Sequence, residues 1–108
     1  MRFDIKTISE ANRREHWASK LKRKKSQQHD FSIIWKSHKP KVQLPATITF
    51  TRYSCQVMDS DNLAGAFKHC RDQLAKEIGV DDGDERLTFI YKQKRIKKRE
   101  HYFTVTIT

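Results

Sequence analysis

The stretch of sequence that decides the fold is ATITFTRYSCQVMDSDNLAGAFKHCRDQLAKEI, residues 46–78. At 46–51 apolar residues alternate with threonines, which is typical of a half-buried β-strand. Asp59-Ser60-Asp61-Asn62 is a cluster of helix N-cap residues. Apolar residues then recur at the spacing of an amphipathic helix, at Leu63, Phe67, Cys70, Leu74 and Ile78. Gly79 is suited to end that helix.

The chain before this stretch predicts a short strand and a long helix. Residues 2–8 alternate weakly, and Thr7-Ile8-Ser9-Glu10 has the pattern of a capping box, so a helix should begin nearby. No Gly or Pro interrupts the chain before Pro40, which favours one helix to about Ser37. One helical face is predicted to carry the apolar positions Trp17, Leu21, Phe31, Ile34 and Trp35, with His38 in phase.

The chain after this stretch predicts two further strands. An acidic loop occupies residues 80–84, and alternation returns at 87–91 and 102–107 on either side of a basic turn at 94–99. We expect these two strands to form a hairpin. The order β-α-β-α-β-β predicts a single α+β domain over residues 1–108, with a small mixed sheet and two main helices.

Composition limits the classes of function. The formal net charge is +10 over 108 residues, an excess suited to a protein that holds a polyanion. Cys55 and Cys70 are the two cysteines, so a disulfide scaffold is excluded, and with His69 they match no zinc spacing. We expect Cys70 to lie in the core. The absence of a long apolar run and of a signal-peptide pattern favours a soluble, cytoplasmic protein.

The charge is unevenly distributed along the chain. Residues 1–58 carry a net +9, residues 59–85 a net −5, and residues 86–108 a net +6. The basic flanks would attract phosphates, whereas the acidic centre would repel them unless cations neutralise it. This pattern suits a metal-dependent nuclease. The alternative is that the acidic side chains are solvated helix and loop charges.

Three aspartates are candidates for a metal site. Asp59 and Asp61, two residues apart, could share one face of an extended chain, and Asp82, or alternatively Asp81, could return to the same place after the helix. Carboxylates without His or Cys suit Mg²⁺ or Mn²⁺, which polarise phosphodiesters and activate water. Each of these features also has a purely structural explanation. Asp61 could cap a helix, the acidic loop could be a solvated turn, and His16-Trp17 could serve in packing.

The acidic half of the chain resembles the RusA-like Holliday junction resolvases. The resemblance lies in Asp59-Ser60-Asp61-Asn62-Leu63, in Lys68 with Arg71-Asp72 and Leu74, and in residues 79–84, GVDDGD. Asn12, His16-Trp17-Ala18 and the basic helix are similar to the amino-terminal half of phage members. Two departures are a longer stretch between Asn62 and Lys68 and the absence of basic residues at 56–58.

The resemblance implies a homodimer that cleaves four-way DNA junctions with Mg²⁺, in a bacterium or a phage-infected host. It assigns the metal-binding and catalytic carboxylates to Asp59, Asp61 and Asp82, and a catalytic lysine to Lys68. Basic residues are expected to bind DNA, namely Arg13, Arg14, Lys20, Lys22, Arg23, Lys24, Lys25, Lys94, Arg95, Lys97, Lys98 and Arg99. The alternatives are a DNA-binding protein of the same fold that does not cleave, and an RNA-binding or ribosomal domain.

Overall fold

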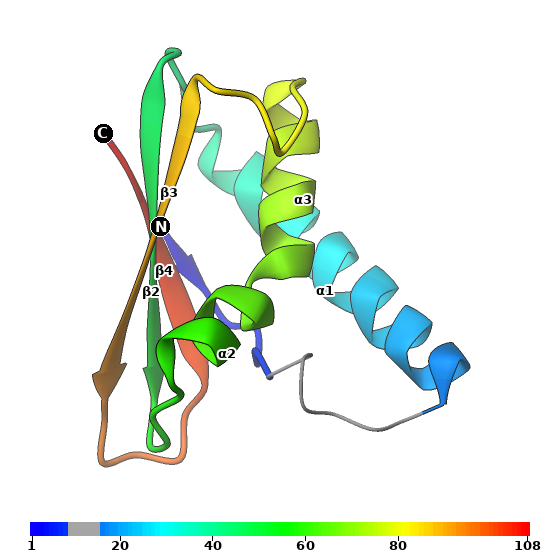
Figure 1. Cartoon of the computed structure of the whole chain (residues 1–108), viewed down its shortest axis with the longest axis vertical. Helices are drawn as coiled ribbons and strands as arrows, with labels where there is room; N and C mark the ends of the chain where they lie inside the picture. The colour runs from blue at the N-terminus through cyan, green and yellow to red at the C-terminus, as the bar shows by residue number, and fades with distance from the viewer. Residues whose placement is uncertain (9–15) are drawn as a thin grey trace.

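The sheet is built around one central strand. The computed structural model describes residues 1–8 and 16–108. Strand β2 (Ala46–Ser54) pairs in parallel with β3 (Leu87–Arg95) and antiparallel with β4 (Tyr102–Ile107), and β4 pairs with β1 (Arg2–Phe3). The strand order is therefore β1-β4-β2-β3, a mixed sheet of four strands (Figure 1).

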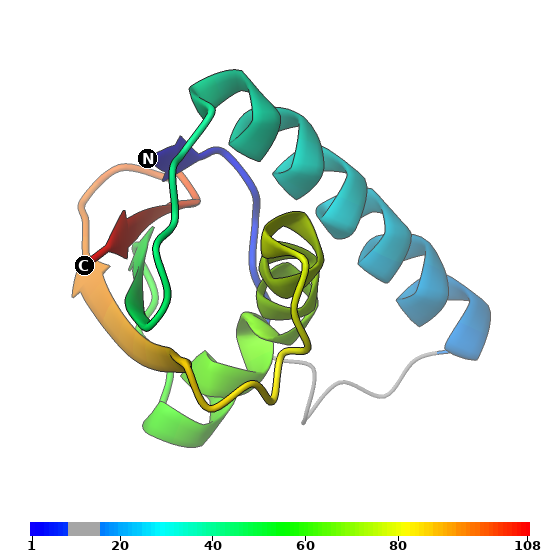
Figure 2. The same cartoon turned by 90° about the horizontal axis from the view of Figure 1, so that it is seen from above.

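Helices cover one face of this sheet. Helices α1 (Trp17–His38), α2 (Ser60–Ala66) and α3 (Lys68–Ile78) all lie on the same side (Figures 1 and 2). Alternate residues of β2 are buried towards them, as the sequence pattern predicts. The core between the layers is mainly aromatic and centres on five fully buried rings: Phe3, Phe31, Phe50, Phe67 and Phe103.

The α+β class, the mixed sheet and the buried position of Cys70 are confirmed. Cys70 is fully buried, and this burial raises the pKa of its thiol to about 12, so it acts as a core residue. None of the helices within residues 1–8 and 16–108 is both long enough and apolar enough to cross a membrane.

The predicted hairpin of the last two strands is wrong. Strands β3 and β4 lie on opposite sides of β2, and the chain between them crosses the end of β2, where Ile96 N–H donates to the Ser54 carbonyl at 3.0 Å. Each of the two strands pairs instead with β2, whose alternate residues are buried. Strand β3 is thus left as an edge strand, carrying the exposed cations Lys92, Lys94 and Arg95.

The first helix begins later than predicted. His16 has an extended backbone, and its Nδ1 accepts the Ala18 N–H at 3.2 Å, so His16 is the N-cap. In the predicted capping box, Thr7 is buried and its hydroxyl accepts a hydrogen bond from Arg52 at 3.2 Å, whereas Ser9 and Glu10 lie outside the described residues. From Trp17 onward the helix is continuous, as predicted, and it ends at His38, before Pro40.

The second predicted helix is divided into two. The helical backbone is interrupted at Phe67, at φ −95° and ψ 0°, and the chain turns there between α2 and α3. Phe67 is fully buried and stacks on Phe50 with ring centroids 4.9 Å apart. The preceding Gly65 and Ala66 give that turn little side-chain bulk. Gly79 ends α3 in the left-handed conformation, at φ 90°, as predicted.

Candidate functional site

Asp59 and Asp61 lie together at the start of α2. The chain leaves β2 at Ser54, and Asp59 then caps α2, with its Oδ1 accepting the Asn62 N–H at 2.9 Å. Asp61 lies in the first turn, and both carboxylates are exposed. The N-cap role considered for Asp61 therefore belongs to Asp59. The pair is located beyond the carboxyl end of a parallel strand, where open sheets commonly bind ligands.

A reciprocal amide contact fixes the approach to this pair. The Gln93 side chain on β3 accepts the Met58 N–H at 3.0 Å and donates to the Met58 carbonyl. Met58 directly precedes Asp59, so the strand next to β2 holds the backbone from which the carboxylates project. Sequence reasoning missed Gln93, because a polar residue in an alternating strand gives no indication of its partner.

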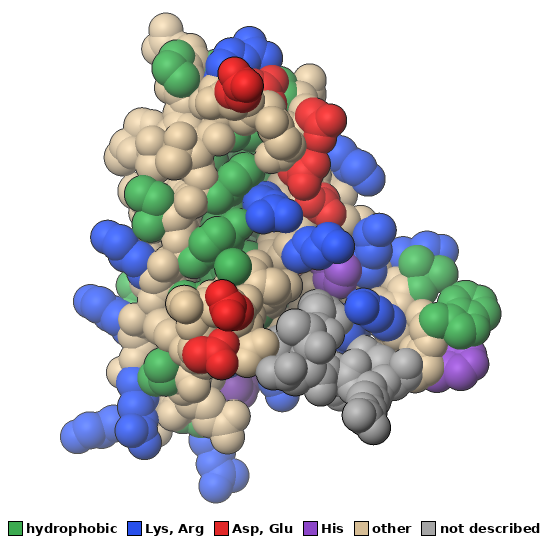
Figure 3. Space-filling view, in the orientation of Figure 1, with side chains coloured by type: hydrophobic (Ala, Val, Ile, Leu, Met, Phe, Trp, Pro, Cys, Tyr) green, Lys and Arg blue, Asp and Glu red, His purple; other side chains and the backbone are tan. Residues whose placement is uncertain are grey.

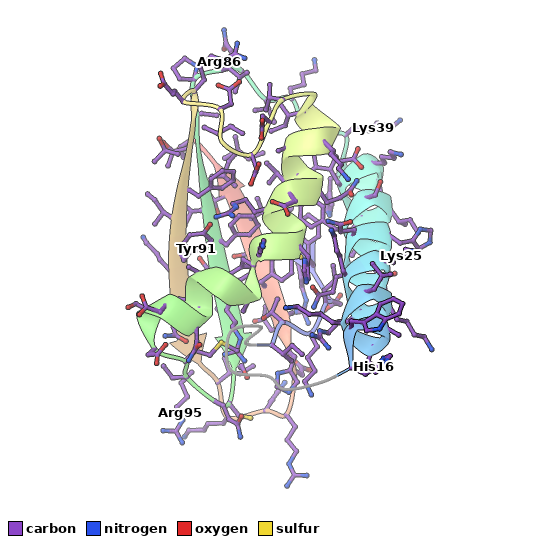
Figure 4. All side chains as sticks on the ribbon, turned by 45° about the vertical axis from the view of Figure 1, so that its right-hand side comes forward. His16, Lys25, Lys39, Arg86, Tyr91 and Arg95 are labelled. Atoms are coloured by element: carbon purple, nitrogen blue, oxygen red, sulfur yellow. The ribbon has the colours of Figure 1, made fainter. Side chains whose placement is uncertain are left out.

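Asp82 lies elsewhere along the same face. Its Oδ2 is 3.8 Å from Arg71 Nη2, and Arg71 Nη1 donates to the Tyr91 hydroxyl at 3.1 Å. Figure 4 places Tyr91 between β3 and the helix layer. Figure 3 shows two separate groups of acidic side chains, one over the start of α2 and one beside the end of α3.

The topology explains why the three aspartates do not converge. A parallel connection must carry the chain back to the opposite end of the sheet before the next strand begins. Helix α3 has 11 residues and spans about 16 Å on this return path. Within the part of the chain that the structure describes, no three His, Cys, Asp or Glu side chains are gathered so as to hold a metal ion. The predicted convergence of Asp82 with Asp59 and Asp61 is wrong for this single chain.

The acidic loop that follows α3 is held partly by its own ion pair. Asp84 is paired with Arg86, whose Nη2 lies 2.8 Å from Asp84 Oδ2. The hydrogen bonds from Arg86 lower the pKa of Asp84 to about 2. Asp81 accepts the Gly83 N–H at 3.3 Å. The loop therefore has the local structure of a solvated turn.

One predicted basic group lies at the same end of the sheet as Asp59 and Asp61. Lys94 and Arg95 end β3, and Lys97, Lys98 and Arg99 follow in the loop to β4, all of them exposed. Arg95 is labelled at this end of the sheet in Figure 4, and Figure 3 shows cationic side chains gathered there. A polyanion bound to these cations would pass close to the two carboxylates. Lys68, the predicted catalytic lysine, is exposed at the first residue of α3.

The second basic group follows the amino-terminal half of α1. Consecutive residues of a helix point about 100° apart, so Lys20, Lys22, Arg23, Lys24 and Lys25 do not share one face. Lys24 lines a hollow of about 450 Å³ with Asp72, Asp81 and Asp82, whereas Lys25 lies beside Trp17 and Leu21. Arg13 and Arg14, also predicted to bind DNA, lie outside the described residues.

Comparisons with known proteins add no identification. No protein-family model matches the chain, and neither a curated protein nor a solved structure gives a significant match.

Proposed function

We propose that the chain is a Mg²⁺-dependent endonuclease that cleaves four-way DNA junctions as a homodimer. The observation that carries this proposal is the exposed pair Asp59 and Asp61, fixed at the carboxyl end of β2 and flanked by the cations of residues 94–99. The cations attract the phosphate backbone, and the carboxylates supply the hard oxygen ligands that a nuclease metal requires.

The residues fit a magnesium ion held partly by its substrate. Proteins commonly bind Mg²⁺ through one or two carboxylates plus a substrate phosphate, and Asp59 and Asp61 provide such a pair. Asp59 uses Oδ1 for the cap bond. Mg²⁺, or Mn²⁺ in its place, would polarise the phosphodiester and activate water. Lys68 would contribute positive charge to the phosphate, whereas Asp82, which is paired with Arg71, would not hold the metal.

The homodimer follows from the substrate. A four-way junction has two equivalent strands to cut, and each chain offers one Asp59–Asp61 pair. A twofold dimer places two such sites symmetrically. Action on recombining DNA would place the protein in the cytoplasm of a bacterium or a phage-infected host.

A DNA-binding protein that does not cleave is the second candidate. It is favoured by the separation of Asp82, which lies beside Arg71 and is not gathered with the other two aspartates. In that case the basic groups would bind the junction, and Asp59 would serve only as the cap of α2.

A cleavage assay on a synthetic four-way junction, with and without Mg²⁺, separates the two candidates. We expect Asp61→Asn to bind the junction but to lose at least about 100-fold in cleavage rate, because the metal loses a charged ligand. The matched control, Asp82→Asn, should cleave within a few-fold of the parent. Binding without cleavage by the parent would establish the second candidate, and absence of junction binding would refute both.

A further inference from the structure

A pocket of about 400 Å³ opens between the amino-terminal segment and the end of β2. Its polar lining comes from Lys6, Thr7, Arg52, Gln56 and His101, and no Asp or Glu of the described residues lines it. We call it the Arg52 pocket. Met58, the neighbour of Asp59, also lines it, so the pocket lies beside the backbone that leads to the carboxylate pair.

Arg52 is a buried cation without a carboxylate partner among the described residues. Its side chain lies on the helix-facing side of β2, and only 5% of the residue is exposed. Nε donates to the Thr7 hydroxyl at 3.2 Å, and Nη1 donates to the Gln56 carbonyl at 2.6 Å. Burial lowers the pKa of Arg52, because the charge is desolvated. Buried charges in proteins are normally paired, so this guanidinium favours the binding of an anion.

Two further groups in the same pocket can contact an anion, one a cation and the other a hydrogen-bond donor. Lys6 is exposed at the rim, and His101 lines the wall. Burial, together with the charges of Lys6 and Arg52, lowers the pKa of His101. The Ser54 hydroxyl lies 3.1 Å from His101 Nδ1 and also accepts the Gln56 N–H at 3.3 Å. When Ser54 donates to Nδ1, the neutral ring carries its hydrogen on Nε2 and remains a donor.

The hydrogen bond between Ser54 and His101 does not mark a nucleophile. Ser54 is 1% exposed and, unlike Arg52, does not line the pocket, so a substrate carbonyl or phosphate cannot approach its oxygen. Its contacts instead hold the imidazole in place. The pocket thus combines fixed hydrogen-bond donors with a charge that no carboxylate of the described residues compensates, which is the chemistry of an anion site.

We propose that the Arg52 pocket binds a phosphate group through Arg52, Lys6 and His101, and that in the functional complex this group is a backbone phosphate of the DNA. The identification of the source as DNA rests on the proposed function, whereas binding of the anion does not. A phosphate held here would lie beside Met58, the residue before Asp59, and would position the DNA strand relative to the carboxylate pair.

The direct test is a titration of the full chain with inorganic phosphate, followed by NMR. We expect saturable shifts of the Arg52 Nε–H and of the His101 ring signals. Lys6→Gln should weaken phosphate binding about fivefold, as expected for one partly exposed charge. The matched control is Lys41→Gln, an exposed lysine before β2, at the opposite end of the strand, and it should leave the titration unchanged. Absence of saturable shifts would refute the anion site.

DNA binding is the second arm, and it identifies the source of the phosphate. In anisotropy titrations of a labelled junction, Lys6→Gln should reduce the slope of log affinity against log salt by about 1 relative to Lys41→Gln. If phosphate binds but DNA does not, the anion site stands and the proposed function fails. If DNA binds equally well to both variants, the function stands and the assignment of the pocket to a DNA phosphate is wrong.

Discussion

The two halves of α1 have similar apolar spacing but different surroundings. In the carboxyl-terminal half, Phe31 and Trp35 are buried, and Phe31 stacks on Phe3 with ring centroids 4.5 Å apart. In the amino-terminal half, Trp17 is 71% exposed and Leu21 is 40% exposed. Figure 2 shows the first turns of α1 extending beyond the other two helices. Trp17 is therefore not packed into the core of the single chain, although its ring lies beside that of His16, with centroids 5.5 Å apart.

The difference between the halves shows what periodicity can and cannot predict. A helical repeat indicates which residues share a face, but another element must reach that face to cover it. Helix α3 and Phe3 of β1 pack against the later half of α1, where Gln28 Nε2 also donates to the His69 carbonyl at 3.2 Å. The earlier half carries most of the cations of α1, so electrostatic repulsion opposes a second copy of the same half packing against it.

The largest expected effect that tests this comparison is on stability. Phe31→Ala should lower the free energy of unfolding by about 3–5 kcal/mol, because it leaves a cavity between three aromatic rings. Leu21→Ala, on the same helix, should change the free energy by no more than about 0.5 kcal/mol. Urea denaturation measures both. A loss at Leu21 as large as that at Phe31 would show that another surface covers the projecting half in solution.

Local patterns predicted the elements of the fold, whereas pairing depended on distant residues. The alternation of β2 and the apolar spacing of α3 could be read from the sequence because each is a property of neighbouring residues. The strands that pair with β4 could not be read from the sequence in the same way. The strand order depends on which distant segments of the chain pair with the two edges of β2. The hairpin prediction failed for this reason.

The candidate site was predicted in part, for a similar reason. The sequence placed Asp59 and Asp61 at a helix start, which local cap chemistry determines. It could not determine which end of the sheet would carry Asp82, because that depends on β3 pairing in parallel with β2. Arg52 is in phase with Ile48 and Phe50, yet sequence reasoning did not select it, because a charged residue in a strand is usually taken to be exposed.

A smaller effect is expected from two adjacent lysines. Lys25→Gln should reduce the slope of log DNA affinity against log salt by about 0.9, because the exposed ammonium can neutralise one phosphate. Lys24→Gln should change the slope much less, since Lys24 lines the hollow with Asp72, Asp81 and Asp82, and these carboxylates compete for its charge. Junction binding at several salt concentrations measures both variants. Equal slopes would mean that the hollow does not distinguish the two side chains.

The smallest expected effect is spectroscopic. Trp17 and Trp35 are the two tryptophans, and only Trp17 is strongly exposed, so iodide should quench the emission of Trp17 far more than that of Trp35. Trp17→Phe should remove most of the quenchable intensity while changing the free energy of unfolding by no more than about 0.5 kcal/mol. Trp35→Phe, the matched control, should retain the quenching.

Junction DNA added to Trp35→Phe should protect Trp17 if the projecting half of α1 contacts DNA. Unchanged quenching on saturation with DNA would place the contact surface at the cations of residues 94–99 instead.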